Sequence, residues 1–61
     1  MTYFGRKPSR SLTFFDAVEI WRLHRLGELQ SRIAARLDVN QGRVSEVLTG
    51  KKFPSARTYR H

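Results

Sequence analysis

The sequence predicts an all-α fold of three helices with a basic arm at each end. Apolar residues recur at helical spacing in three short segments between residues 14 and 49, and no segment alternates as a strand does. A chain of 61 residues has room for one small domain, which excludes a two-domain enzyme, a nucleotide-binding α/β fold and a repeat array. We expect arms at residues 1–12 and 51–61 around a helical domain at 13–50.

The first helix is predicted over about residues 14–26. Thr13 can cap its N-terminus, and Asp16 stands three residues later, where it completes a capping box. Gly27 follows the last apolar residue and can adopt the left-handed conformation that ends helices.

This first helix has more apolar surface than one small core needs. Its inward face is formed by residues at helical spacing, Ala17, Ile20, Trp21 and His24, of which we interpret His24 as a half-buried core residue. Three further apolar residues lie off that face and predict an outer strip: Phe15, Leu23 and Leu26. The strip favours a homodimer through the first helix, unless Tyr3, Phe4 or Phe53 folds back over it.

The second helix is predicted over about residues 30–37 and the third over about 41–49. Ile33, Ala34 and Leu37 form the inward face of the second helix, and Val44, Val47 and Leu48 that of the third. Asn40 is a strong N-cap for the third helix, while Gly50 and Pro54 mark its end.

The net charge of +7 lies entirely at the two ends of the chain. Residues 13–49 carry equal numbers of acidic and basic side chains, whereas both flanks contain bases and no acid. The basic residues of the flanks are Arg6, Lys7, Arg10, Lys51, Lys52, Arg57 and Arg60. Unbalanced basic ends of this kind are typical of electrostatic arms that contact a polyanion; the alternative is a pair of solvated tails.

The window from Gln30 to Gly50 resembles the helix-turn-helix of DNA-binding regulators. It is similar to the Cro and repressor proteins of lambdoid phages and to the trihelical DNA-binding domains of recombinases. Ala34 supplies the small residue where the two helices cross, and branched apolar residues flank it. The family usually has Gly where this chain has Asp38, one of the few other residues that tolerate a left-handed backbone.

This resemblance implies that the third helix, at about 41–49, is a recognition helix in the major groove of DNA. Gln41 would pair with adenine, Arg43 with guanine or a phosphate, and Glu46 with cytosine. The remaining residues expected at the DNA surface of this helix are Asn40, Gly42, Ser45 and Thr49. Gly42 would allow a close approach to the duplex. Alternatively, these polar side chains only solvate the helix, with Glu46 paired to Arg43 or Lys52.

Other basic and amide side chains are expected to contact the DNA backbone. The resemblance places a phosphate contact at Gln30, and Arg32 and Arg36 could add others or be surface charges near Glu28 or Asp38. Lys51 and Lys52 would meet the phosphates beside the recognition helix, and Arg6, Lys7 and Arg10 would enter the minor groove. We expect four aromatic residues to pack on the domain or a partner rather than stack on bases: Tyr3, Phe4, Phe53 and Tyr59.

We expect neither an enzyme nor a cofactor or metal site. The chain has no Cys, and two His, at positions 24 and 61, do not make a metal site. No apolar run approaches the roughly 20 residues that cross a bilayer, so we expect no membrane partner and a cytoplasmic, nucleoid-associated protein. Double-stranded DNA is the expected partner. The alternatives are a module that docks on RNA polymerase or a recombinase, and a small RNA-binding protein.

Overall fold

The computed structural model describes residues 12–59, which form three α-helices and one short 3-10 helix and contain no strand. The elements are α1 (Phe14–Arg25), α2 (Gln30–Leu37), α3 (Gln41–Leu48) and η1 (Pro54–Arg57). The predicted all-α class with three helices is therefore confirmed. The residues assigned to the N-terminal arm, Arg6, Lys7 and Arg10, lie outside the described part of the chain, as do Tyr3, Phe4, Arg60 and His61.

The first helix begins with the capping box that the sequence predicts. The Thr13 hydroxyl accepts a hydrogen bond from the Asp16 amide at 3.1 Å, and the Thr13 amide donates to the Asp16 carboxylate at 2.9 Å. The helix ends at Arg25, one residue earlier than expected, and Leu26 is its C-cap. Gly27 has a φ of +90°, so the chain turns at the residue predicted to stop this helix.

The turn between α2 and α3 is fixed by two residues. Asp38 caps α2 in the left-handed conformation, with φ 56° and ψ 47°, as expected for the position where the helix-turn-helix family usually has Gly. Asn40 caps α3 because its side-chain oxygen accepts a hydrogen bond of 2.7 Å from the Gly42 amide. The left-handed backbone at Asp38 ends α2, and the Asn40 cap starts α3.

Replacing Asn40 by Ala should lower the free energy of unfolding by about 1 kcal/mol, because the Gly42 amide loses its acceptor. In a domain of this size such a loss corresponds to a decrease of about 4–8 °C in Tm. Thermal unfolding followed by circular dichroism measures it. Asn40→Asp keeps an acceptor at the cap and should unfold close to the wild type. Equal destabilisation by Ala and Asp would show that the cap is not the cause.

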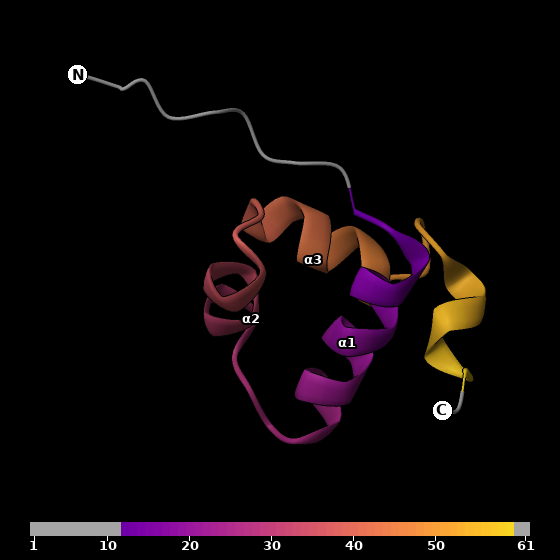
Figure 1. Ribbon diagram of the computed structural model, residues 1–61, viewed down its shortest axis with the longest axis horizontal. Coiled ribbons are helices and arrows are strands. Elements are labelled where there is room, and N and C mark those ends of the chain that lie inside the picture. The colour runs from indigo at the N-terminus through magenta and orange to yellow at the C-terminus, as the bar shows by residue number, and fades with distance from the viewer. Residues whose placement is uncertain (1–11, 60–61) are drawn as a thin grey trace.

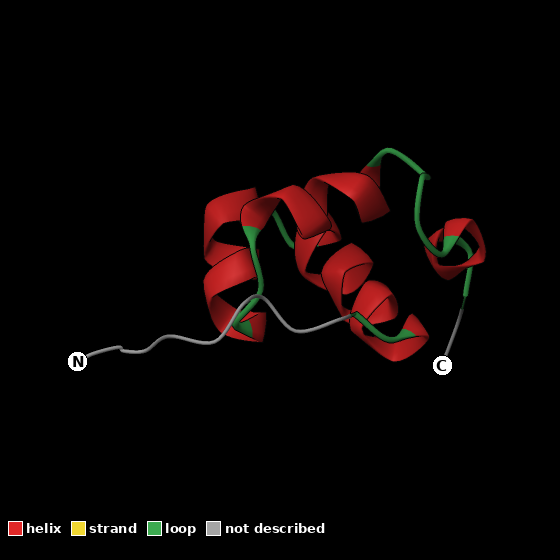
Figure 2. Cartoon of the chain, turned by 90° about the horizontal axis from the view of Figure 1, so that it is seen from above, coloured by secondary structure: helices red, strands yellow, loops and turns green. Residues whose placement is uncertain are grey.

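The core is formed where α1, α2 and α3 meet. The largest fully buried side chains come from all three helices: Ile20, Ile33, Val44 and Val47. Figure 1 and Figure 2 show α2 and η1 on opposite sides of α1, with α3 crossing beside the N-terminal half of α1. Ala34 is only 5% exposed, so the small residue predicted at the α2 crossing is in the core.

The segment after α3 forms an element that the sequence pattern does not predict. η1 packs against α1 and buries Ala56 completely. Phe53 precedes η1 with a φ of 50°, is half-buried, and places its ring 6.2 Å from Phe14. The Tyr59 ring lies 5.4 Å from Phe14 as well. The expectation that Phe53 and Tyr59 pack on the domain is therefore confirmed.

Two expectations for α1 were wrong. Leu23 is 5% exposed and belongs to the core, so it is not part of an outer apolar strip. The reason is helical spacing: Leu23 lies three residues after the fully buried Ile20, so it shares the side of α1 that packs into the core. His24 is exposed rather than half-buried, and its ring lies edge-on to that of Trp21 at 5.6 Å.

Candidate nucleic-acid interface

The outer face of α3 is polar and accessible at its N-terminal turn. Val44 and Val47 point into the core, which leaves Gln41, Gly42 and Arg43 exposed. Ser45 and Glu46 are half-buried, and Thr49 is exposed at the C-cap. The residues proposed to read base edges therefore lie on the exposed arc of α3, with Gln41 and Arg43 at its two edges.

Arg43 is held by an ion pair within α3. Its guanidinium lies 3.4 Å from the Glu46 carboxylate, one turn further along the helix. This arrangement is the alternative considered from the sequence, in which Glu46 pairs with Arg43. Both side chains remain accessible to solvent, so the pair can open when a stronger partner arrives.

The C-terminal end of α3 has less freedom to donate hydrogen bonds. The Thr49 hydroxyl donates to the Ser45 carbonyl oxygen at 2.9 Å, so its hydrogen is already used inside the helix. The Lys51 and Lys52 amides both donate to the Glu46 carbonyl oxygen, at 2.9 and 3.2 Å. Their backbone is therefore fixed beside α3 while their side chains are exposed.

Gly42 leaves the N-terminal turn of α3 open to close approach. A Cβ atom added at this position would lie 3.1 Å from the Asn40 side-chain oxygen. Glycine at this position therefore leaves room both for the Asn40 side chain in its capping position and for a surface that approaches the helix.

The second helix contributes fewer free cations than its sequence suggests. Arg36 forms an ion pair of 3.2 Å with Glu28, which is one of the two surface roles considered for it. Arg32 is exposed and forms no ion pair among the described residues, and Gln30 is half-buried at the first position of α2. Gln30, Arg32 and the α3 face all belong to the closely packed α2–α3 unit.

Within residues 12–59 no group of three or more His, Asp or Glu side chains could hold a metal ion. In the same residues no helix is long and apolar enough to cross a membrane.

No protein-family model matches this chain, and the searches of curated proteins and of solved structures found no match either. The functional proposal therefore rests on the residues themselves.

Proposed function

We propose that this protein binds double-stranded DNA sequence-specifically, as a transcriptional regulator of bacterial or phage type that acts in the cytoplasm at the nucleoid. In this proposal α2, the turn at 38–40 and α3 form a helix-turn-helix, and α3 enters the major groove. The observation that carries the proposal is the exposed polar turn Gln41, Gly42 and Arg43 at the start of a helix whose other side is buried. The major groove, about 12 Å wide, admits one such helix.

The charge distribution supports the same proposal. Lys51 and Lys52 are exposed directly after α3, where they can reach the phosphates that border the groove. The basic residues near the N-terminus add charge for a polyanion, since the chain carries +7 in total. An RNA-binding or protein-docking role would not require an exposed amide and an exposed guanidinium in the first turn of a helix.

A homodimer is part of the proposal, now with a smaller contact than the sequence indicated. Phe15 and Leu26 remain 67% and 69% exposed, whereas Leu23 is buried. A two-fold dimer would bind two half-sites about 34–36 Å apart on the duplex. Selection of bound duplexes from a random library tests both points. A discrete palindromic site with this spacing supports the proposal, while uniform, salt-sensitive retention of all sequences contradicts it.

Gln41→Ala and Arg43→Ala should each weaken binding to the selected site and relax discrimination at one base position. A bidentate contact between a side chain and a base is worth about 1–3 kcal/mol, so each variant should lose roughly 5- to 150-fold in affinity. Binding to a scrambled duplex should change much less. Fluorescence anisotropy with the selected and the scrambled duplex measures both affinities.

Arg22→Ala is a matched control for Arg43→Ala. Arg22 also pairs with a Glu one turn away, since its Nε donates to the Glu19 carboxylate at 2.9 Å, but it lies on α1. That hydrogen bond, together with the attraction between the two charges, raises the pKa of Arg22, so the control removes a full positive charge. If Arg22→Ala and Arg43→Ala weaken specific binding equally, Arg43 contributes charge and not base recognition.

A further inference from the structure

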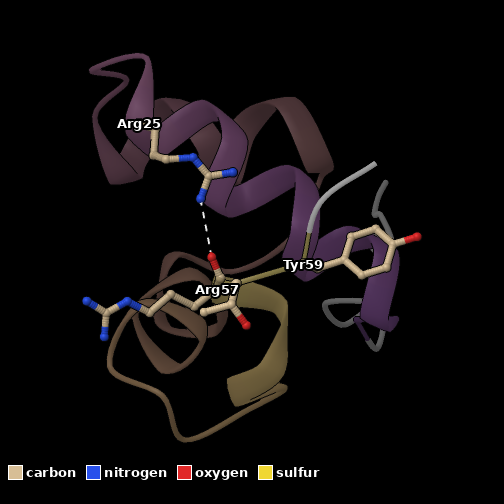
Figure 3. Close-up of a pocket in the computed structure, with 4 residues that line it drawn as sticks. Arg25, Arg57 and Tyr59 are labelled. Carbon is tan, nitrogen blue, oxygen red and sulfur yellow. Dashed lines mark hydrogen bonds between the residues drawn. The ribbon is translucent and has the colours of Figure 1, made fainter.

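A hollow of about 340 Å³ lies between the C-terminal end of α1 and η1 (Figure 3). It is lined by Arg25, Arg57, Thr58 and Tyr59. One Nη atom of Arg25 donates to the Arg57 carbonyl oxygen at 3.4 Å, which links the two walls. The Arg57 guanidinium points away from Arg25 and lies 5.7 Å from the centre of the Trp21 ring. The hollow is thus lined by arginines from two different elements, with the Arg57 guanidinium on the Trp21 side.

The positive charge at this hollow is not compensated within the described residues. Three acidic side chains are already paired with other arginines, in the pairs Glu19–Arg22, Glu28–Arg36 and Glu46–Arg43. Neither Arg25 nor Arg57 forms an ion pair among residues 12–59, and no acidic residue lines the hollow. An anionic group could therefore bind here without displacing a carboxylate of residues 12–59.

Exposed aromatic rings lie at the other end of the same surface. Tyr59 lines the hollow and is 37% exposed, and its ring lies 6.0 Å from that of Phe15, which is 67% exposed. We call Phe15, Arg25, Arg57 and Tyr59 the α1–η1 face. A duplex phosphate would use the arginines but not the rings, because stacking on aromatic side chains requires unpaired bases. Cations beside exposed rings fit a ligand that is both acidic and apolar.

The Arg25 end of the α1–η1 face lies away from the proposed DNA surface, whereas Phe15 is at the start of α1. Figure 1 shows the C-terminal end of α1 at the opposite end of the molecule from α3. We propose that the α1–η1 face binds an acidic peptide segment of another protein, with carboxylates at Arg25 and Arg57 and an apolar side chain against Phe15 and Tyr59. This inference uses none of the α3 residues, but it shares Phe15 with the proposed homodimer contact, so the peptide and a second copy would compete for that side chain.

The test is a titration of the full chain with a fluorescein-labelled synthetic peptide of Glu and Leu with one Phe. Anisotropy gives its affinity, and the emission of Trp21, the single Trp of the chain, reports binding beside Arg57. The same peptide with Gln in place of Glu should not bind. Arg25→Gln with Arg57→Gln should weaken binding about tenfold, the loss expected for two exposed ion pairs. Thermal unfolding checks that the double variant folds. If the double variant is unfolded, Arg25→Gln alone is tested instead, and its peptide affinity should fall about threefold.

The matched control is Lys51→Gln with Lys52→Gln, which removes the same charge near α3 and should leave the peptide affinity within about twofold. Equal losses in the two double variants, or equal binding of the Gln peptide, would overturn the proposal. Displacement of the peptide by unlabelled duplex DNA would assign the face to nucleic acid, and a dimer in sedimentation experiments that excludes the peptide would assign it to a second copy. Either result contradicts an acidic peptide partner.

Discussion

Replacing Ile33 by Ala should lower the free energy of unfolding by about 2–5 kcal/mol, because the truncation removes buried methyl groups and leaves a cavity. Ile33 is completely buried on α2, in a cluster with residues of α1 and α3. At 0.05–0.15 kcal/mol per residue, a chain of this length has a total stability of only about 3–9 kcal/mol. We therefore expect a large fraction of the variant to be unfolded at 37 °C. Urea unfolding followed by far-ultraviolet circular dichroism measures the change.

Leu29→Ala is the control for this substitution. Leu29 immediately precedes α2, four residues before Ile33, but is 64% exposed. Its truncation should change the free energy of unfolding by no more than about 0.5 kcal/mol. A similar loss in both variants would mean that the α2 contacts with α1 and α3 do not limit stability.

Local signals in the sequence predicted the limits of the helices well. Thr13, Gly27 and Asn40 act on residues within one turn of themselves, so their effect does not depend on the rest of the fold. Asp38 is a similar case, because tolerance of a left-handed backbone is a property of the residue type. These positions fixed the start of α1 and both ends of the turn that precedes α3.

Contacts between distant segments could not be predicted in the same way. The sequence pattern does not indicate that residues 53–59 return to pack on α1, where Phe53 and Tyr59 meet Phe14. Pro54 indicates the end of a helix, but not that Ala56, two residues later, is completely buried. The α1–η1 face has the same origin, since Arg25 and Arg57 are 32 residues apart in sequence.

The candidate site lies between these two cases. The exposed positions of α3 follow from helical spacing, so Gln41, Gly42 and Arg43 could be placed from the sequence. Glu46 could pair with either Arg43 or Lys52, and only side-chain geometry decides that its partner is Arg43. In the proposed complex this pair has a physical consequence: Arg43 is held near the start of α3 before binding and exchanges Glu46 for a base or phosphate. The exchange keeps the guanidinium paired in both states.

Neutralising Arg6, Lys7 and Arg10 together should weaken binding to every duplex and reduce its dependence on salt. These residues lie outside the described part of the chain, so the expectation rests on their charge. If each displaces one counterion, the slope of log K against log salt should fall in magnitude by about 0.9 per contact, or roughly 2.7 for all three. Between 50 and 200 mM salt, the wild-type affinity should then drop about fortyfold more than that of the variant.

The base composition beside the operator separates a minor-groove arm from a general phosphate contact. A-tracts have a narrow minor groove with enhanced negative potential, so the loss from the triple variant should be largest where the flanking sequence is rich in A·T. Lys51→Ala with Lys52→Ala should reduce the salt slope without that preference, because both side chains would contact only phosphates. Affinities over a salt series, with flanks of both compositions, measure these effects. An unchanged slope in the triple variant would show that the N-terminal basic residues are a solvated tail, and the positive charge used on DNA would then be that of α2, α3 and Lys51–Lys52.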